Sequence, residues 1–183
     1  MKRRSVKRRR GLGMALLTVG IAALVAWQWL LPQMREWPHV PTYGAMSWGY
    51  GQPVSYQSCG FHTGDDWFAP IGTPIFAVED GTVLYVGPLW LDGEGVGRGP
   101  YSIVLYHEAG DYWTTYGHNS VALVEAGDEV RRGQKIAEVG DLGYSPAPHL
   151  HFEKVVTPFT GNWEQPFVGC EGYVDPGDRW SPI

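Results

Sequence analysis

Between residues 73 and 156 the chain alternates short apolar runs with glycine-containing turns. The runs are rich in β-branched and aromatic residues, and no stretch keeps a helical period for more than two turns. Strands and turns at such regular spacing are typical of antiparallel sheets and sandwiches. We therefore expect an all-β fold, mainly an antiparallel sheet or sandwich. The runs predict strands at residues 73–78, 81–87, 101–108, 111–118, 134–140 and 149–156.

A different pattern precedes this region, because residues 11–31 form an uncharged and almost entirely apolar run. Its 21 residues match the length of about 20 that a helix needs to cross the hydrocarbon core of a membrane. Pro32 follows directly and stops the helix. We predict one transmembrane signal-anchor helix over 11–31. The alternative is a cleaved signal peptide, but its apolar core is usually about 7–15 residues and no clean A-x-A cleavage site follows.

Charge is divided unequally around this span. Residues 1–10 contain seven Lys or Arg and no acidic residue. Since the formal net charge of the whole chain is −5, the part from Gly11 onward carries −12. The basic head predicts an N terminus in the cytoplasm, a single pass through the cytoplasmic (inner) membrane and a domain in the periplasm or outside the cell. The acidic remainder would repel phosphates, which excludes nucleic-acid binding.

The chain divides into five expected segments. They are a basic head (1–10), the membrane helix (11–31), a proline-containing tether or first wrapping segment (32–48), a folded domain (49–156) and an irregular C-terminal tail (157–183). Within the domain, the glycine-rich residues 88–100 predict a flexible rim loop. Their spacing does not match a dinucleotide-binding motif, and no helix follows them.

Two cysteines occur, Cys59 and Cys170. In an exported chain they most simply form one disulfide, which could stabilise the fold by up to about 5 kcal/mol in the chain-entropy model. The alternative is that Cys59 binds a metal ion, since it lies three residues before His62.

Residues 149–156 give the sharpest geometry in the sequence. If they form a strand, His149, His151 and Glu153 lie on one face while Leu150 and Phe152 lie on the other. Two imidazoles on one face can bind a metal ion together, or one can bind it while the other reaches the open position. Two unrelated polar residues on a solvated face remain the alternative for this pair taken alone.

A second cluster joins His62, Gly64 and two adjacent carboxylates. Gly64 permits a tight bend that would bring His62 and Asp66 together. A histidine and a carboxylate are ordinary zinc ligands, although spacing alone leaves Asp65 as a rival to Asp66. Tyr116-Gly117-His118 at the end of a predicted strand is a third, weaker element.

Taken together, these elements resemble the lysostaphin/LytM-type zinc metallopeptidases, metallopeptidase family twenty-three, which cleave peptide bonds in bacterial peptidoglycan. The resemblance covers about residues 58–156. It is carried in order by H-x-G-x-D at residues 62–66, by Y-x-H at 116–118 and by H-L-H-F-E at 149–153. The stretch at residues 126–140 also looks like half of a lipoyl or biotinyl carrier domain, which we interpret as shared β architecture.

The resemblance implies a role for each matching position. His62, Asp66 and His151 would bind Zn²⁺, with the fourth tetrahedral position left for water. His118 and His149 would be the catalytic histidines. The chain contains no H-E-x-x-H motif, so the general base must be histidine.

Other residues are weaker candidates for supporting the ligands or lining the substrate groove. Glu153 could orient an imidazole, or it could be solvated. Tyr116 belongs to the Y-x-H motif, and Trp67 is adjacent to Asp66 but could equally pack in the core. Arg98 could contact a substrate carboxylate, or it could be an exposed charge in the rim loop.

The sequence therefore predicts a membrane-anchored, zinc-dependent endopeptidase that hydrolyses peptide stems or crosslinks of peptidoglycan. One alternative is a non-catalytic LytM-type module that binds the wall or activates another hydrolase. All five implied ligand and catalytic positions are occupied in this chain, which favours the enzyme. A secreted peptidase for protein substrates would differ only in its groove.

Overall fold

The computed structural model describes residues 42–89, 97–162, 166–167 and 169–177. Within these residues the chain forms β-strands and no helix, which confirms the predicted all-β fold. The strands are β1 (Ala45–Trp48), β2 (Asp65–Phe68), β3 (Pro74–Phe76), β4 (Gly81–Gly87), β5 (Ser102–His107), β6 (Tyr112–Gly117), β7 (Asn119–Ala122), β8 (Glu129–Val130), β9 (Lys135–Val139), β10 (His149–Val155) and β11 (Tyr173–Val174).

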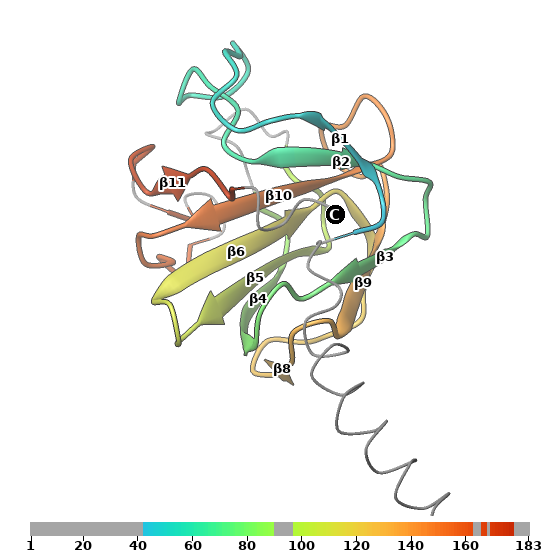
Figure 1. Cartoon of the computed structure of the whole chain (residues 1–183), viewed down its shortest axis with the longest axis vertical. Helices are drawn as coiled ribbons and strands as arrows, with labels where there is room; N and C mark the ends of the chain where they lie inside the picture. The colour runs from blue at the N-terminus through green and yellow to red at the C-terminus, as the bar shows by residue number, and fades with distance from the viewer. Residues whose placement is uncertain (1–41, 90–96, 163–165, 168, 178–183) are drawn as a thin grey trace, which may run out of the picture. The chain divides into compact units, whose positions relative to one another are not determined.

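The strands build two antiparallel sheets. The larger has the order β1-β2-β10-β6-β5-β4-β8, with β11 paired to β10, and the smaller has the order β3-β9-β7. Figure 1 shows β10 between β2 and β6 in the larger sheet, with β3 and β9 beside it. The strand with the H-L-H-F-E motif is thus a central strand, with its backbone fixed by neighbours on both edges.

The main hydrophobic core joins residues of both sheets. Ile103 and Leu105 of β5, Leu150 and Phe152 of β10, and Ile136 of β9 all belong to it. Because alternate residues of a strand point to opposite faces, this core uses one face of the larger sheet. The other face remains for a second cluster and for the polar side chains described below.

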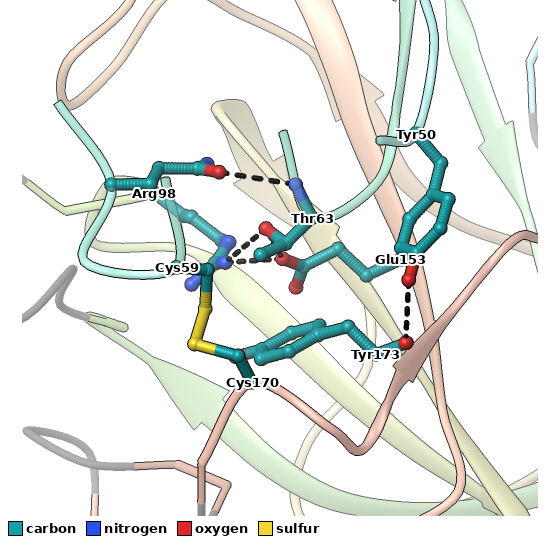
Figure 2. Close-up of a disulfide and its surroundings, with 8 residues drawn as sticks. Tyr50, Cys59, Thr63, Arg98, Glu153, Cys170 and Tyr173 are labelled. Atoms are coloured by element: carbon teal, nitrogen blue, oxygen red, sulfur yellow. Dashed lines mark hydrogen bonds and ion pairs between the residues drawn. A yellow bond between two sulfur atoms is a disulfide. The ribbon is translucent and has the colours of Figure 1, made fainter. Parts of the chain in front are cut away.

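The second cluster covers part of that other face with residues from the C-terminal segment. Phe167 packs there with Val104, Trp113 and Val155, and Tyr173 contributes from β11. The segment is also held covalently, because Cys59 and Cys170 form a disulfide with their Cα atoms 5.5 Å apart (Figure 2). The predicted disulfide is confirmed, and metal binding by Cys59 is therefore wrong.

The six predicted strands correspond to β3, β4, β5, β6, β9 and β10, with ends that differ by a few residues. The remaining strands, β1, β2, β7, β8 and β11, were not expected. Among them, β1 lies in the segment predicted as a tether and pairs with β2, and Thr42 is bridged to Ile75, so the folded part begins before Gly49. In the predicted tail, β11 pairs with β10.

The membrane helix predicted over 11–31 lies outside the described residues, as does the basic head. In the parts of the chain that the structure describes, no helix is long and apolar enough to span a membrane.

Candidate metal centre

The outer face of β10 carries the polar residues that the alternation predicts. His149, His151 and Glu153 are buried on this face, while Leu150 and Phe152 belong to the main core on the other. The solvated-face alternative for the two histidines is therefore wrong. Both imidazoles lie in a site built over the sheet.

Strand register determines which aspartate joins them. His151 is directly opposite Asp66 in the β10–β2 pair, whereas Asp65 is opposite Phe152. Opposed residues of an antiparallel pair project from the same face, so Asp66 faces His151. The Asp65 carboxylate instead accepts the Tyr50 backbone N–H at 2.9 Å. The structure thus separates the two carboxylates that spacing alone left open.

His62 reaches the same point from the segment that precedes β2. Its Nδ1 donates to the Gly49 carbonyl at 3.2 Å, which leaves Nε2 directed at His151 and Asp66. Gly64 lies at a bend, as predicted, and it also makes this approach possible in a second way. A Cβ at position 64 would overlap the Phe152 carbonyl oxygen, so glycine allows this segment to lie directly against β10.

The three donor atoms form a compact triangle. His62 Nε2 lies 3.2 Å from both His151 Nδ1 and Asp66 Oδ1, and His151 Nδ1 lies 2.8 Å from Asp66 Oδ1. Atoms bound at about 2.0–2.1 Å to a tetrahedral zinc ion lie roughly 3.3–3.4 Å from one another. Two nitrogens and one carboxylate oxygen at this spacing fit a zinc ion, with the fourth position open.

The ionisable groups in and beside the triangle shift one another's pKa values. Burial opposes ionisation of Asp66, but hydrogen bonds from His151 and His62 outweigh it and hold the carboxyl pKa well below its usual range. Burial likewise opposes protonation of His151, yet Glu153 and Asp66 raise the His151 pKa to about 9. Metal binding at His151 Nδ1 would have to displace any proton on that atom.

Two further imidazoles lie beside the triangle. His118 Nδ1 donates to the Leu142 carbonyl at 2.7 Å, and His149 Nδ1 donates to the Ala147 carbonyl at 2.7 Å. Their rings are 4.5 Å apart, and His149 Nε2 lies 3.5 Å from Asp66 Oδ1. Each backbone contact fixes the proton on Nδ1 and leaves Nε2 as a proton acceptor.

The surroundings of both histidines favour the neutral imidazole. Burial, together with the neighbouring His151 and His149, lowers the pKa of His118 to about 3. Burial also lowers the pKa of His149, although Asp66 opposes this shift. Neutral imidazoles in this position can accept a proton from a bound water molecule.

Of the weaker candidates, Glu153 lies against His151, and the solvated alternative is wrong. Its side chain is 0% exposed, and its Oε1 lies 3.1 Å from His151 Nε2. Trp67 and Tyr116 do not line the groove, because both lie in the main core on the opposite face. The Tyr116 hydroxyl accepts the Val78 N–H at 3.2 Å, so its role is structural.

Arg98 differs most from its prediction. It lies in the described part of the predicted rim loop, whereas residues 90–96 of that loop lie outside the described residues. Its side chain is 1% exposed and forms an ion pair with Glu153, so it is not an exposed charge, and it is among the residues that line the pocket described next.

The triangle opens into a pocket of about 250 Å³. Tyr56, Gln57, Tyr144 and Ser145 line it together with the histidines. None of these four residues was singled out from the sequence, because they lie in irregular segments where no periodicity tells which way a side chain points. The tyrosine rings of Tyr56 and Tyr144 approach to 5.5 Å.

Comparison with known proteins adds independent information about this site. The model of the family described as Peptidase family M23 matches residues 60–161. This range contains the three residues of the donor triangle and the two neighbouring histidines, His118 and His149. Lysostaphin from Staphylococcus simulans is 36% identical over 138 residues, which are 74% of this chain and 27% of lysostaphin. The peptidoglycan DD-endopeptidase ShyB from Vibrio cholerae is 39% identical over 98 residues, which are 52% of this chain and 20% of that protein.

The fold agrees with these similarities. The crystallised catalytic domain of lysostaphin from Staphylococcus simulans superposes with a TM-score of 0.58 at 32% identity, covering 73% of this chain and 89% of that chain. The chain spans less than a third of the full length of lysostaphin and ShyB, so the likeness concerns one domain of each.

Proposed function

Since the chain belongs to Peptidase family M23, we propose that it is a zinc-dependent endopeptidase that hydrolyses peptide stems or crosslinks of bacterial peptidoglycan. The observation that carries the proposal is the donor triangle of His62, Asp66 and His151 at zinc-compatible spacing, with two further imidazoles beside it. Lysostaphin and a peptidoglycan DD-endopeptidase among its relatives support the substrate class.

His62 Nε2, Asp66 Oδ1 and His151 Nδ1 would hold the zinc ion. When bound, zinc acts as a Lewis acid on a peptide carbonyl and lowers the pKa of a water molecule toward about 7. The pocket beside the triangle gives a peptide access to it, because the pocket is lined by His118 and His149 as well as by two of the ligands.

His118 and His149 supply the proton transfers. One of them accepts the proton of the attacking water at Nε2 while its Nδ1 stays bonded to a backbone carbonyl. The protonated imidazole then stabilises the oxyanion and returns a proton to the leaving amine. Glu153 is not available as the base, because its oxygens already contact Arg98, Thr63, Thr115 and His151.

We propose further that residues 11–31 anchor the chain in the cytoplasmic membrane and leave the domain facing the wall. This proposal is supported by the uncharged run and by the basic residues before it. Retention of the full chain in washed membranes would support it, and release as a shortened soluble form would show a cleaved signal peptide instead.

Digestion of purified peptidoglycan by the full chain, followed by mass analysis of the fragments, tests the function. We expect new peptide termini in the presence of zinc and none after its removal by a chelator. The double substitution His118→Ala, His149→Ala is the matched control, because it keeps the donor triangle. Intact peptidoglycan in the presence of zinc-loaded chain would overturn the proposal and indicate a wall-binding module.

A further inference from the structure

A buried charge network lies behind the proposed zinc ligand His151, and it joins Glu153 to Arg98, which is outside the motifs that carry the family resemblance. Glu153 is its centre, because its buried carboxylate forms an ion pair with Arg98 and its Oε1 lies 3.1 Å from His151 Nε2. Thr63 donates to Glu153 Oε1 at 2.6 Å and Thr115 donates to Oε2. These contacts fix both oxygens of a carboxylate that faces His151 Nε2.

The guanidinium group of Arg98 completes the network. Its Nη2 forms an ion pair with Glu153 Oε1 and lies 3.3 Å from Thr63 Oγ1, as Figure 2 shows. Thr63 is adjacent to the ligand His62 in the chain. The Arg98 guanidinium therefore contacts both Glu153, which lies against His151, and Thr63, which is next to His62 in the chain.

The main chain of Arg98 reaches the other half of the site. Its carbonyl accepts the His118 backbone N–H at 2.6 Å. His118 has a φ of 63°, a left-handed conformation that is uncommon for a residue other than glycine and that depends on surrounding contacts. The carbonyl of Arg98 is one such contact.

The packing around Arg98 leaves it little freedom. A Cβ at Gly117 would lie 2.9 Å from the Arg98 Cβ, and a Cβ at Gly99 would lie 2.9 Å from the Leu142 carbonyl oxygen. Leu142 is the residue whose carbonyl binds His118 Nδ1. The glycines therefore allow close contact between the Arg98 segment and the segments that hold His118.

We infer that Arg98 is a positioning residue for both halves of the site: its guanidinium holds Glu153 against His151, and its carbonyl holds the peptide of His118. The inference rests on the proposed function, because it takes His151 as a zinc ligand. A carboxylate behind a metal-bound histidine fixes the ring and raises its basicity, and loss of such a partner typically weakens metal binding about 10–100-fold.

The test compares Zn²⁺ affinity in the full chain and three variants by competition with a chelator. Arg98→Met with Glu153→Gln removes both buried charges at similar volume, so neither is left unpaired. Arg98→Lys keeps the charge without the planar fork. Lys135→Met with Glu138→Gln is the matched control, because it removes an exposed ion pair in β9.

We expect the Arg98 and Glu153 double variant to bind zinc about 10–100-fold more weakly, Arg98→Lys to lose less, and the control to equal the unchanged chain. The visible spectrum of the Co²⁺-loaded double variant should shift, and the His118 amide should exchange its hydrogen faster. Thermal unfolding of the metal-free proteins reports whether each variant is folded.

A folded double variant with unchanged zinc affinity and cobalt spectrum would overturn the inference and leave the ion pair purely structural. If the double variant does not fold, Arg98→Lys is tested in its place. Weaker zinc binding by Arg98→Lys would support the inference, and an unchanged zinc affinity and cobalt spectrum would overturn it. Unchanged His118 exchange with weakened zinc binding would overturn the link to His118. Failure of the unchanged chain to bind zinc would overturn the proposed function itself.

Discussion

His149 and His151 lie two residues apart on β10, yet we expect their loss to have opposite effects. His151→Ala removes a proposed ligand atom and should abolish zinc binding and activity together. His149→Ala should keep the zinc and lower activity by about 10²–10⁴-fold, the usual contribution of a general acid or base. Metal analysis after dialysis and release of peptidoglycan fragments measure the two properties.

Zinc loss in His149→Ala with zinc retained in His151→Ala would reverse the two assignments. The geometry argues against that outcome. His151 Nδ1 lies 2.8 Å from Asp66 Oδ1, whereas His149 Nε2 lies 3.5 Å from it.

The lowered pKa of His118 predicts how stability depends on pH in the metal-free chain. Burial and the neighbouring His151 and His149 bring that pKa to about 3, whereas an unfolded histidine titrates near about 6.5. Between these values the unfolded state binds the extra proton, so the free energy of unfolding falls as pH falls, by at most about 1.4 kcal/mol per pH unit from this group.

His118→Asn should therefore reduce the acid sensitivity of the metal-free chain. Asparagine accepts the left-handed conformation at this position and does not titrate. Urea unfolding at several pH values between about 6.5 and 4.5 measures the difference. Parallel pH curves for the variant and the unchanged chain would contradict this prediction, since other acidic and basic groups contribute equally to both.

At the scale of elements, the contact between the His62 segment and β10 depends on Gly64. A Cβ there would overlap the Phe152 carbonyl, so Gly64→Ala should force the backbones apart and lower the free energy of unfolding by about 1–3 kcal/mol. Zinc binding should weaken with it. Gly49→Ala is the control, because its Cβ would meet no atom closer than 3.8 Å.

Thermal unfolding of both metal-free variants measures this effect. Equal midpoints for the two would show that the His62 segment adapts to a side chain at Gly64. The bend at Gly64 would then be the remaining reason for glycine at this position.

The same strands show what the sequence could predict. The alternation of His149, Leu150, His151 and Phe152 is local, and it placed two histidines on one face correctly. Strand pairing is not local, so spacing in the sequence could not distinguish Asp66 from Asp65. The β2–β10 register does distinguish them. The family resemblance supplied that choice without the register.

Arg98 shows where sequence reasoning stopped. Charged residues are mostly exposed, and the glycines around Arg98 suggested a mobile loop. Gly99 in fact permits a close contact with the Leu142 backbone, and Gly143 permits one with the Gly97 carbonyl. The arginine is buried against Glu153. An irregular segment has no period from which the direction of a side chain can be inferred, and the partner carboxylate is distant in sequence.

At the scale of the whole molecule, the C-terminal segment lies on the same face of the larger sheet as the site. It supplies Phe167 and Tyr173 to the second cluster, and the Tyr50 hydroxyl donates to the Tyr173 carbonyl at 2.8 Å. Cys170 ties this segment to the one that carries His62. Most of this segment lies beyond residues 60–161, which the family model matches. The disulfide and the second cluster therefore attach a segment that is outside the matched domain.

Replacing both cysteines by serine should therefore destabilise the chain. The disulfide closes a loop with a sequence separation of 111 residues, for which the chain-entropy model gives about 5 kcal/mol at most. Urea unfolding followed by tryptophan fluorescence measures the loss. Unfolding of the variant at the same urea concentration as the oxidised chain would show that the noncovalent contacts of the segment suffice.

The long span of this disulfide also sets an order of events during synthesis. Cys59 is made 111 residues before its partner, by which time every strand from β2 to β10 has been made. The bond can therefore close only after β10, the strand that carries His151, has been made. Both strands that align Asp66 with His151 are therefore present in the chain before oxidation can join the two cysteines.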